Sequence, residues 1–168
     1  LNSHFATLST DGLNCTTTDD MAAAWQMRDY RVDTKPSDGW HATFHVEDRY
    51  DLLGDKPPPC LRYTGLTEDA DVLTAEGWVA LSGSTWGVDE AWIPRLLVRR
   101  SGAHLRSTFV GILEAYVAAP RVLSARRLDI APRNGSAPTD SDIALEITLD
   151  DGRRDVIVAL DASAQPWE

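Results

Sequence analysis

Hydrophobic and polar residues alternate at every second position along much of this chain. Between Trp40 and Val46, four apolar residues alternate with two histidines and a threonine, and the segment Ile143–Leu149 repeats the pattern. A period of two is that of a β-strand with one buried face, whereas an amphipathic helix repeats about every 3.6 residues. No segment of helical length carries a convincing helical stripe. The pattern therefore predicts an all-β protein.

A turn signal stands near the C-terminal end of the chain. The pair Asp151-Gly152 separates the alternating run Ile143–Leu149 from the β-branched run Val156–Leu160. Such a pair is typical of a β-hairpin, because a type I′ turn needs positive φ at both of its central positions. We expect a hairpin here, with Asp151 and Gly152 at its turn.

Seven further segments are expected to form strands: His4–Leu8, Ala22–Met27, Cys60–Leu66, Asp71–Leu81, Ile93–Arg100, Ser107–Val117 and Arg121–Ile130. The segment Ser107–Val117 is apolar on both alternating faces, which is typical of a central strand buried on both sides. Many short strands without intervening helices favour two packed antiparallel sheets, a β-sandwich. We expect this sandwich to be a single domain spanning residues 1–168.

The charge of the chain limits its partners. The formal net charge is −10, which argues against nucleic acid and disfavours polyanions except at a local basic patch. No apolar run approaches the roughly 18 residues that span a bilayer, so no membrane contact is expected. Because the chain begins at Leu1 rather than at a methionine, we expect a fragment or a processed product. Cys15 and Cys60 either form one disulfide or stay two separate thiols.

Two histidines have a spacing that is familiar from metal sites. His41 and His45 match the pattern H-x-x-x-H. On a strand, however, four residues span about 13 Å, too far for two ligands of one zinc ion. We interpret them as solvent-facing histidines on a polar sheet face, and we expect neither a metal nor another cofactor.

The segment Gly83–Gly87 reads Gly-Ser-Thr-Trp-Gly and mimics a nucleophile elbow with threonine in the place of serine. An elbow needs a following helix and later acid and histidine partners, whereas a further strand follows here and only His104 lies downstream. We interpret the segment as a loop that displays Trp86. An exposed indole can stack on a pyranose ring, so Trp86 is a candidate sugar ligand. The alternative is a loop tryptophan packed on the sandwich edge.

Arginines supply a second candidate surface. Guanidinium groups suit the carboxylates and sulfates of acidic polysaccharides. Because Arg99 and Arg100 point to opposite faces of one strand, only one of them joins a given patch. The candidate carbohydrate-binding residues are therefore Trp86, Arg95, Arg99 and Arg106. The alternative is that the arginines pair with the abundant Asp and Glu residues on a solvated face.

The region Trp92–Ile130 carries three β-rich segments, WIPRLLVRRSG, RSTFVGILEAYV and PRVLSARRLDI. Together with a Leu-Arg-Tyr strand at 61–63, an Ala-Glu-Gly-Trp-Val segment at 75–79 and the closing hairpin, it resembles the C-terminal β-domain of heparinase II/III-like polysaccharide lyases. The likeness covers roughly Cys60 to Leu160 and consists of strand patterns rather than a catalytic signature.

Lyases of this family carry a helical toroid ahead of their β-sheets and cleave acidic polysaccharides by β-elimination. A tyrosine and histidines act on the substrate proton, and one histidine belongs to a Gly-His-x-Asp-like motif at the start of the β-domain. None of the four histidines of this chain is followed by Asp two residues later. The resemblance therefore transfers no catalytic residue.

The resemblance implies a non-catalytic accessory domain of a bacterial lyase, secreted or periplasmic. Such a domain would pack on the catalytic domain of its parent chain and line the cleft for an acidic polysaccharide. Two alternatives stay open. One is an autonomous carbohydrate-binding module that uses Trp86. The other is a protein-interaction sandwich, which would expose a large apolar patch.

Overall fold

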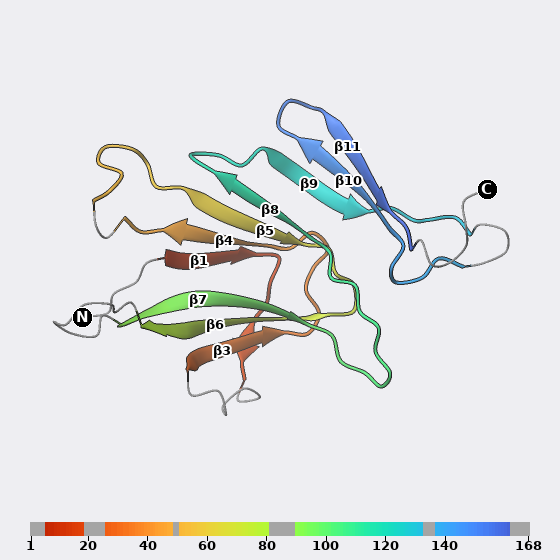
Figure 1. Ribbon diagram of the computed structural model, residues 1–168, viewed down its shortest axis with the longest axis horizontal. Helices are drawn as coiled ribbons and strands as arrows, with labels where there is room; N and C mark the ends of the chain where they lie inside the picture. The colour runs from red at the N-terminus through yellow and green to blue at the C-terminus, as the bar shows by residue number, and fades with distance from the viewer. Residues whose placement is uncertain (1–5, 19–25, 49–50, 81–89, 133–136, 162–168) are drawn as a thin grey trace.

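The computed structural model describes residues 6–18, 26–48, 51–80, 90–132 and 137–161 (Figure 1). Within these ranges the protein is all-β and every strand pairing is antiparallel. The same ranges contain no helix that could cross a membrane. The strands are β1 (Ala6–Asp11), β2 (Thr16–Thr17), β3 (Met27–Asp33), β4 (His41–Val46), β5 (Cys60–Gly65), β6 (Asp71–Ala80), β7 (Glu90–Arg99), β8 (Gly111–Tyr116), β9 (Val122–Arg127), β10 (Ile143–Leu149) and β11 (Arg154–Ala159).

These strands form three sheets, and not only the two that the sequence pattern favours. Sheet A has the order β1-β4-β5-β8, sheet B the order β2-β3-β6-β7, and sheet C the order β11-β10-β9. Sheet A lies between the other two in Figure 1. Alternation along a sequence identifies strands but does not say which strand pairs with which. Strands β9, β10 and β11 pair with one another and make the unexpected third sheet.

One hydrophobic core lies between sheets A and B. Trp40 and Ala42, at the start of β4, and Val72 of β6 are buried there. Leu8 of β1 and Val98 of β7 pack around them. The apolar positions at the start of β4 therefore face sheet B, as the alternating pattern predicts.

A second core joins the opposite face of sheet A to sheet C. Leu66 and Val110, next to the ends of β5 and β8, pack against Ile143 and Leu145 of β10. Side chains alternate between the faces of a strand, so these two residues of sheet A lie on the face that does not meet sheet B. Sheet A therefore contributes to both cores.

Polar contacts hold the first strand of sheet C onto sheet A. Arg62 of β5 and Glu114 of β8 form an ion pair of 2.8 Å, with 12% of each side chain exposed. Glu114 also accepts hydrogen bonds from the backbone N–H groups of Arg121 and Val122, where β9 begins. Arg62 donates to the carbonyl oxygen of Val122. One carboxylate and one guanidinium thus anchor β9 to the middle sheet.

Strand β8 is not the doubly buried central strand that its two apolar faces predict. It is an edge strand of sheet A and pairs with β5. Leu113 is 67% exposed, and its neighbours Phe109 and Val117 are also exposed. On the opposite face Val110 and Ile112 meet sheet C. Only one apolar face of this segment has a partner sheet, so that part of the prediction is wrong.

The C-terminal hairpin is confirmed, with a different turn. Strands β10 and β11 pair from Ile143–Ala159 to Thr148–Arg154. The N–H of Gly152 donates to the carbonyl of Leu149 at 3.0 Å, and Gly152 has a φ of 81° while Asp151 does not have positive φ. A three-residue hairpin loop that ends in a left-handed glycine and a bulge has these features. The expected type I′ turn would need positive φ at both Asp151 and Gly152.

Candidate functional site

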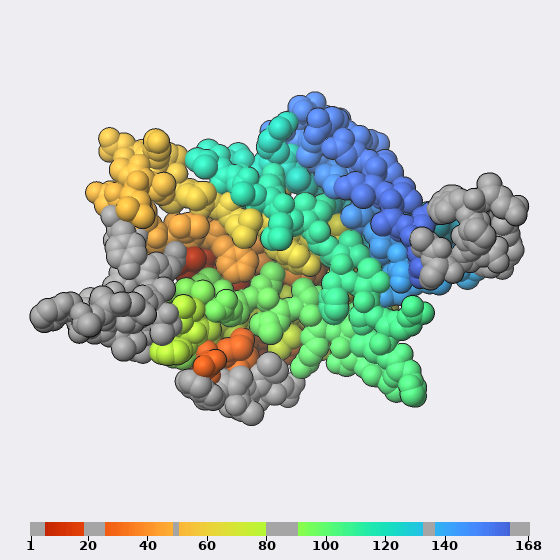
Figure 2. All heavy atoms as spheres, viewed as in Figure 1, coloured from red at the N-terminus to blue at the C-terminus, as the bar shows by residue number. Residues whose placement is uncertain are grey.

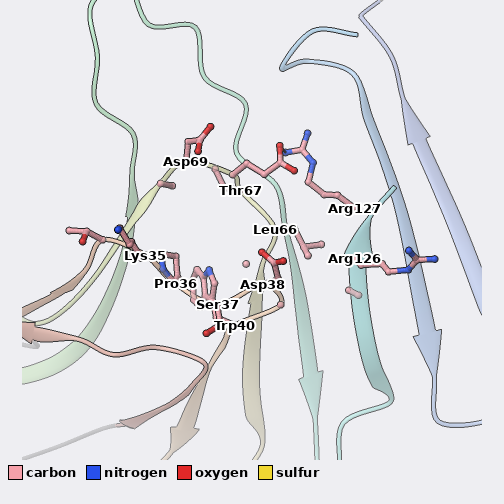
Figure 3. A pocket seen from close by; sticks show the side chains of 16 residues that line it. Lys35, Pro36, Ser37, Asp38, Trp40, Leu66, Thr67, Asp69, Arg126 and Arg127 are labelled. Atoms are coloured by element: carbon pink, nitrogen blue, oxygen red, sulfur yellow. Dashed lines mark ion pairs between the residues drawn. The ribbon is translucent and has the colours of Figure 1, made fainter. Parts of the chain in front are cut away.

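A cavity of about 620 Å³ lies between the β3–β4 loop, the β5–β6 loop and β9, and we call it the junction cleft (Figure 3). One wall is the β3–β4 loop, residues 34–40, and the other is formed by the β5–β6 loop, residues 66–70, with residues 125–127 of β9. Figure 2 shows the β9–β11 region, in teal and blue, packed along one side of the other strands. The cleft therefore lies where segments far apart in sequence converge.

The first wall is braced by the carboxylate of Asp33 and by a backbone hydrogen bond within the loop. Asp33, which is buried at the end of β3, accepts hydrogen bonds from the N–H groups of Asn14 at 2.7 Å and Lys35 at 2.8 Å. The N–H of Trp40 donates to the carbonyl of Ser37 at 3.1 Å. These bonds fix the course of the β3–β4 loop, so its side chains enter the cleft from a defined backbone.

The second wall is braced by a threonine. The hydroxyl of Thr67 donates to the carbonyl of Val110 at 3.1 Å and accepts from the N–H of Val110 at 2.9 Å. The N–H of Leu66 also donates to the carbonyl of Val110, at 3.0 Å. The β5–β6 loop is thus tied to the chain that enters β8.

Charges of both signs line the cleft in equal number. The cations are Lys35, Arg126 and Arg127, and the carboxylates are Asp38, Glu68 and Asp69. Arg127 pairs with Glu68 at 3.4 Å across the second wall. In Figure 3 the Asp38 side chain lies between the walls, whereas Arg126 points away from the cleft. The groups that face the cleft therefore offer hydrogen-bond donors and acceptors with no excess of positive charge.

Trp40 lines the cleft but gives it no open aromatic platform. The indole is buried and packs at a ring-centroid distance of 5.5 Å from Tyr63. Hydroxyl groups of Thr34, Ser37 and Thr67 supplement the charged side chains of the lining. Polar contacts, more than ring stacking, would hold a ligand here.

The carbohydrate-binding residues named from the sequence do not meet at this cleft. Trp86 lies outside the described residues. Arg95 and Arg99 lie on the same face of β7, where Arg95 is exposed and its stem crosses Gly77 of β6. Arg106 is exposed in the loop between β7 and β8. The structure thus brings Arg95 and Arg99 onto one surface, and a sugar-binding role for the set stays a prediction.

Many of the arginines have carboxylate partners. Among the ion pairs of 2.6–3.4 Å are Arg99–Asp71, Arg100–Asp140, Arg121–Asp150, Arg126–Glu146 and Arg127–Glu68. Burial alone would raise the pKa of the Asp140 carboxyl, but the N–H of Thr108 and the guanidinium of Arg100 hold the pKa below its usual range. The positive charges of these five arginines are therefore already paired with carboxylates of the chain and are not free to bind a polyanion.

The two histidines of β4 have separate partners. His41 Nε2 lies 3.7 Å from a carboxylate oxygen of Asp11. His45 is exposed and makes its contacts with Ser9 and Cys60. Among the residues that the structure describes, no group of three or more His, Cys, Asp or Glu side chains could hold a metal ion.

No family model matches this chain, and no curated protein or solved structure is significantly similar to it. The resemblance to heparinase II/III-like lyases therefore stays a prediction from strand patterns. Of the four candidate carbohydrate-binding residues predicted from the sequence, the three that the structure describes do not line the junction cleft. The signal that could have pointed to one wall is the polar run 34–39, with its proline and glycine, between two strands.

Proposed function

We propose that this chain is a non-catalytic accessory β-domain of a larger saccharide-processing protein, and that it binds a saccharide in the junction cleft. The observation that carries the proposal is a cavity of about 620 Å³ with braced walls and a polar lining that has no excess of positive charge. Pockets that bind small molecules measure roughly 300–1,000 Å³. Sugar hydroxyl groups both donate and accept hydrogen bonds, which matches a lining of carboxylates, cations and hydroxyls.

The balance of charge favours a neutral saccharide over the acidic polysaccharide that the strand pattern suggests. The Asp38 carboxylate would accept hydrogen bonds from sugar hydroxyls but would repel a uronate. Arg127 is already paired with Glu68, and the whole chain carries −10 charges. Attraction of a polyanion requires an excess of local positive charge, which this lining does not supply.

The composition of the lining supports a binding role. Lyases of the kind that this chain resembles use tyrosine and histidine to move the substrate proton. Neither residue type is among those that line the cleft. The cleft therefore lacks the two residue types that act on the substrate proton in those lyases.

The test is a titration of the protein with neutral gluco-oligosaccharides and with oligouronates of the same length. Tryptophan fluorescence is suitable because Trp40 lines the cleft, and calorimetry gives the affinity. We expect saturable binding of a neutral oligosaccharide. Replacing Asp38→Ala should weaken that binding about ten-fold or more, because a hydrogen bond to a charged group contributes about 1.5–3 kcal/mol.

Asp55→Ala is the matched control. Asp55 is an exposed carboxylate in the β4–β5 loop and is not among the cleft-lining residues, so its loss should leave the affinity unchanged. Tighter binding of the oligouronate would restore the acidic polysaccharide as ligand. The cleft proposal fails if no saccharide binds, or if Asp38→Ala and Asp55→Ala both bind like the unmodified protein.

A further inference from the structure

Three side chains with nucleophile and base chemistry meet on sheet A, away from the junction cleft. Ser9 comes from β1, His45 from β4 and Cys60 from β5, which are adjacent strands. His45 is directly opposite Cys60 in the strand register. Arg62 projects from the same face of β5 as Cys60, because the two residues are two positions apart. Ser9, His45 and Cys60 therefore lie on the same face of sheet A as Arg62, which contacts sheet C. Ser9 and His45 are themselves exposed.

Both ring nitrogens of His45 have a partner. Nε2 lies 2.8 Å from the Ser9 hydroxyl oxygen, and Nδ1 lies 3.5 Å from the Cys60 sulfur. A neutral imidazole has one N–H and one acceptor nitrogen. We assign the proton to Nε2, because an oxygen atom accepts a hydrogen bond better than a thiol sulfur does. Nδ1 then directs its lone pair at the Cys60 thiol.

We propose that Cys60 is an activated thiol that forms mixed disulfides with low-molecular-weight disulfides. His45 acts as its base, and Ser9 is a positioning residue that holds the imidazole in the required tautomer. The thiol proton passes to His45 Nδ1, and the thiolate sulfur attacks one sulfur of the disulfide. A new sulfur–sulfur bond forms at Cys60 while the old one breaks, and the leaving thiolate takes the proton from the imidazolium.

The other cysteine provides an internal reference. Cys60 and Cys15 are both free and both partly exposed. Burial, together with the nearby Asp33 carboxylate, raises the pKa of the Cys15 thiol. Since the thiolate is the reactive form, Cys15 should react slowly. A difference in rate between the two reflects the surroundings of both thiols, and the substitutions at His45 and Ser9 isolate the contribution at Cys60.

Two other charged groups of this face have partners of their own. Arg62 pairs with Glu114, and His41 lies beside Asp11. Tyr116 of β8 is opposite Cys60 in the register. His45 is therefore the group that the structure places to accept the thiol proton.

The experiment measures the reaction of each cysteine with 2,2′-dithiodipyridine at about pH 6.5. An ordinary thiol is mostly protonated at this pH, because its pKa is near 8.5. Thione release gives the total rate, and peptide mapping assigns the adducts to Cys60 or Cys15. We expect Cys60 to react about ten-fold or more faster than Cys15. His45→Gln should slow Cys60 by about ten-fold or more, as expected for loss of a general base.

Two further substitutions separate the roles on this face. Ser9→Ala should slow Cys60 by a smaller factor, and Ser9→Thr should restore the rate because it keeps the hydroxyl. His41→Gln is the matched control, since it removes the other histidine of β4 and should change nothing. Near-ultraviolet circular dichroism of each variant checks that the fold is kept.

The proposal is overturned if Cys60 reacts no faster than Cys15, or if His45→Gln and His41→Gln have the same rate as the unmodified protein. If His45→Gln does not fold, the pair Ser9→Ala and Ser9→Thr decides in its place. Equal rates in these two variants would then refute the role of the imidazole.

Discussion

Trp40 packs so closely on Gly65 that position 65 has no room for a side chain. A Cβ atom there would lie 2.2 Å from two ring carbons of Trp40. We predict that Gly65→Ala lowers the free energy of unfolding in urea by about 1–3 kcal/mol, the usual cost of overpacking a core. Gly102→Ala is the control, because its Cβ would meet Leu105 at an ordinary 3.5 Å. Equal stability of the two variants would contradict this account.

The burial of single residues can be predicted from the sequence, whereas contacts between distant strands cannot. The alternating pattern correctly puts Trp40 in the core. The contact of Ser9 with His45 joins residues 36 positions apart, and it arises only because β1 pairs with β4 in one register. A sequence displays the residue types of such a cluster but not the strand pairing that assembles it. For this reason the sequence indicates a histidine spacing and two cysteines but not the contact of His45 with Ser9 and Cys60.

At the scale of strands, periodicity gave the clearest predictions. Strands β4, β5, β6, β7 and β10 lie where alternation places them. Strand β3 was largely missed, because the expected segment Ala22–Met27 overlaps it only at Met27 and the rest of β3 is rich in charged residues. Strand β8 lies within a segment predicted to be a strand, but it is at the edge of its sheet and not at the centre. Apolar residues on both faces are compatible with a central strand and also with an edge strand that one sheet covers.

The edge position of β8 can be tested on one leucine. Leu113 is 67% exposed, so we predict that Leu113→Lys changes the free energy of unfolding by no more than about 0.5 kcal/mol. Leu73 of β6 is 2% exposed, and Leu73→Ala should cost about 2–5 kcal/mol. Urea unfolding of both variants gives the comparison. A loss at Leu113 as large as that at Leu73 would mean that β8 is buried on both faces after all.

At the scale of the whole molecule, the third sheet determines the candidate site. One wall of the junction cleft is the β3–β4 loop, and β9 completes the other wall beside the β5–β6 loop, so the cleft depends on the docking of sheet C. The sequence predicted the strands of sheet C and its hairpin. It did not predict that these strands form a separate sheet, because the docking depends on a few polar contacts between distant residues. The cleft could not be predicted without that arrangement.

Glu114 is the residue on which this docking can be tested. Glu114→Ala would leave the guanidinium of Arg62 buried without its carboxylate and would remove the acceptor of two N–H groups of β9. Breaking one side of a buried ion pair costs about 3–5 kcal/mol, and we predict a loss of this size in urea unfolding.

Hydrogen exchange should locate this loss in sheet C, with the amides of β10 exchanging faster relative to those of β4. Glu146→Ala is the control, because its partner Arg126 is 66% exposed and such surface pairs contribute at most about 1 kcal/mol. If both variants lose the same stability, the third sheet is held by its apolar core alone. If Glu114→Ala also weakens saccharide binding while Asp55→Ala does not, the cleft depends on the docking of sheet C.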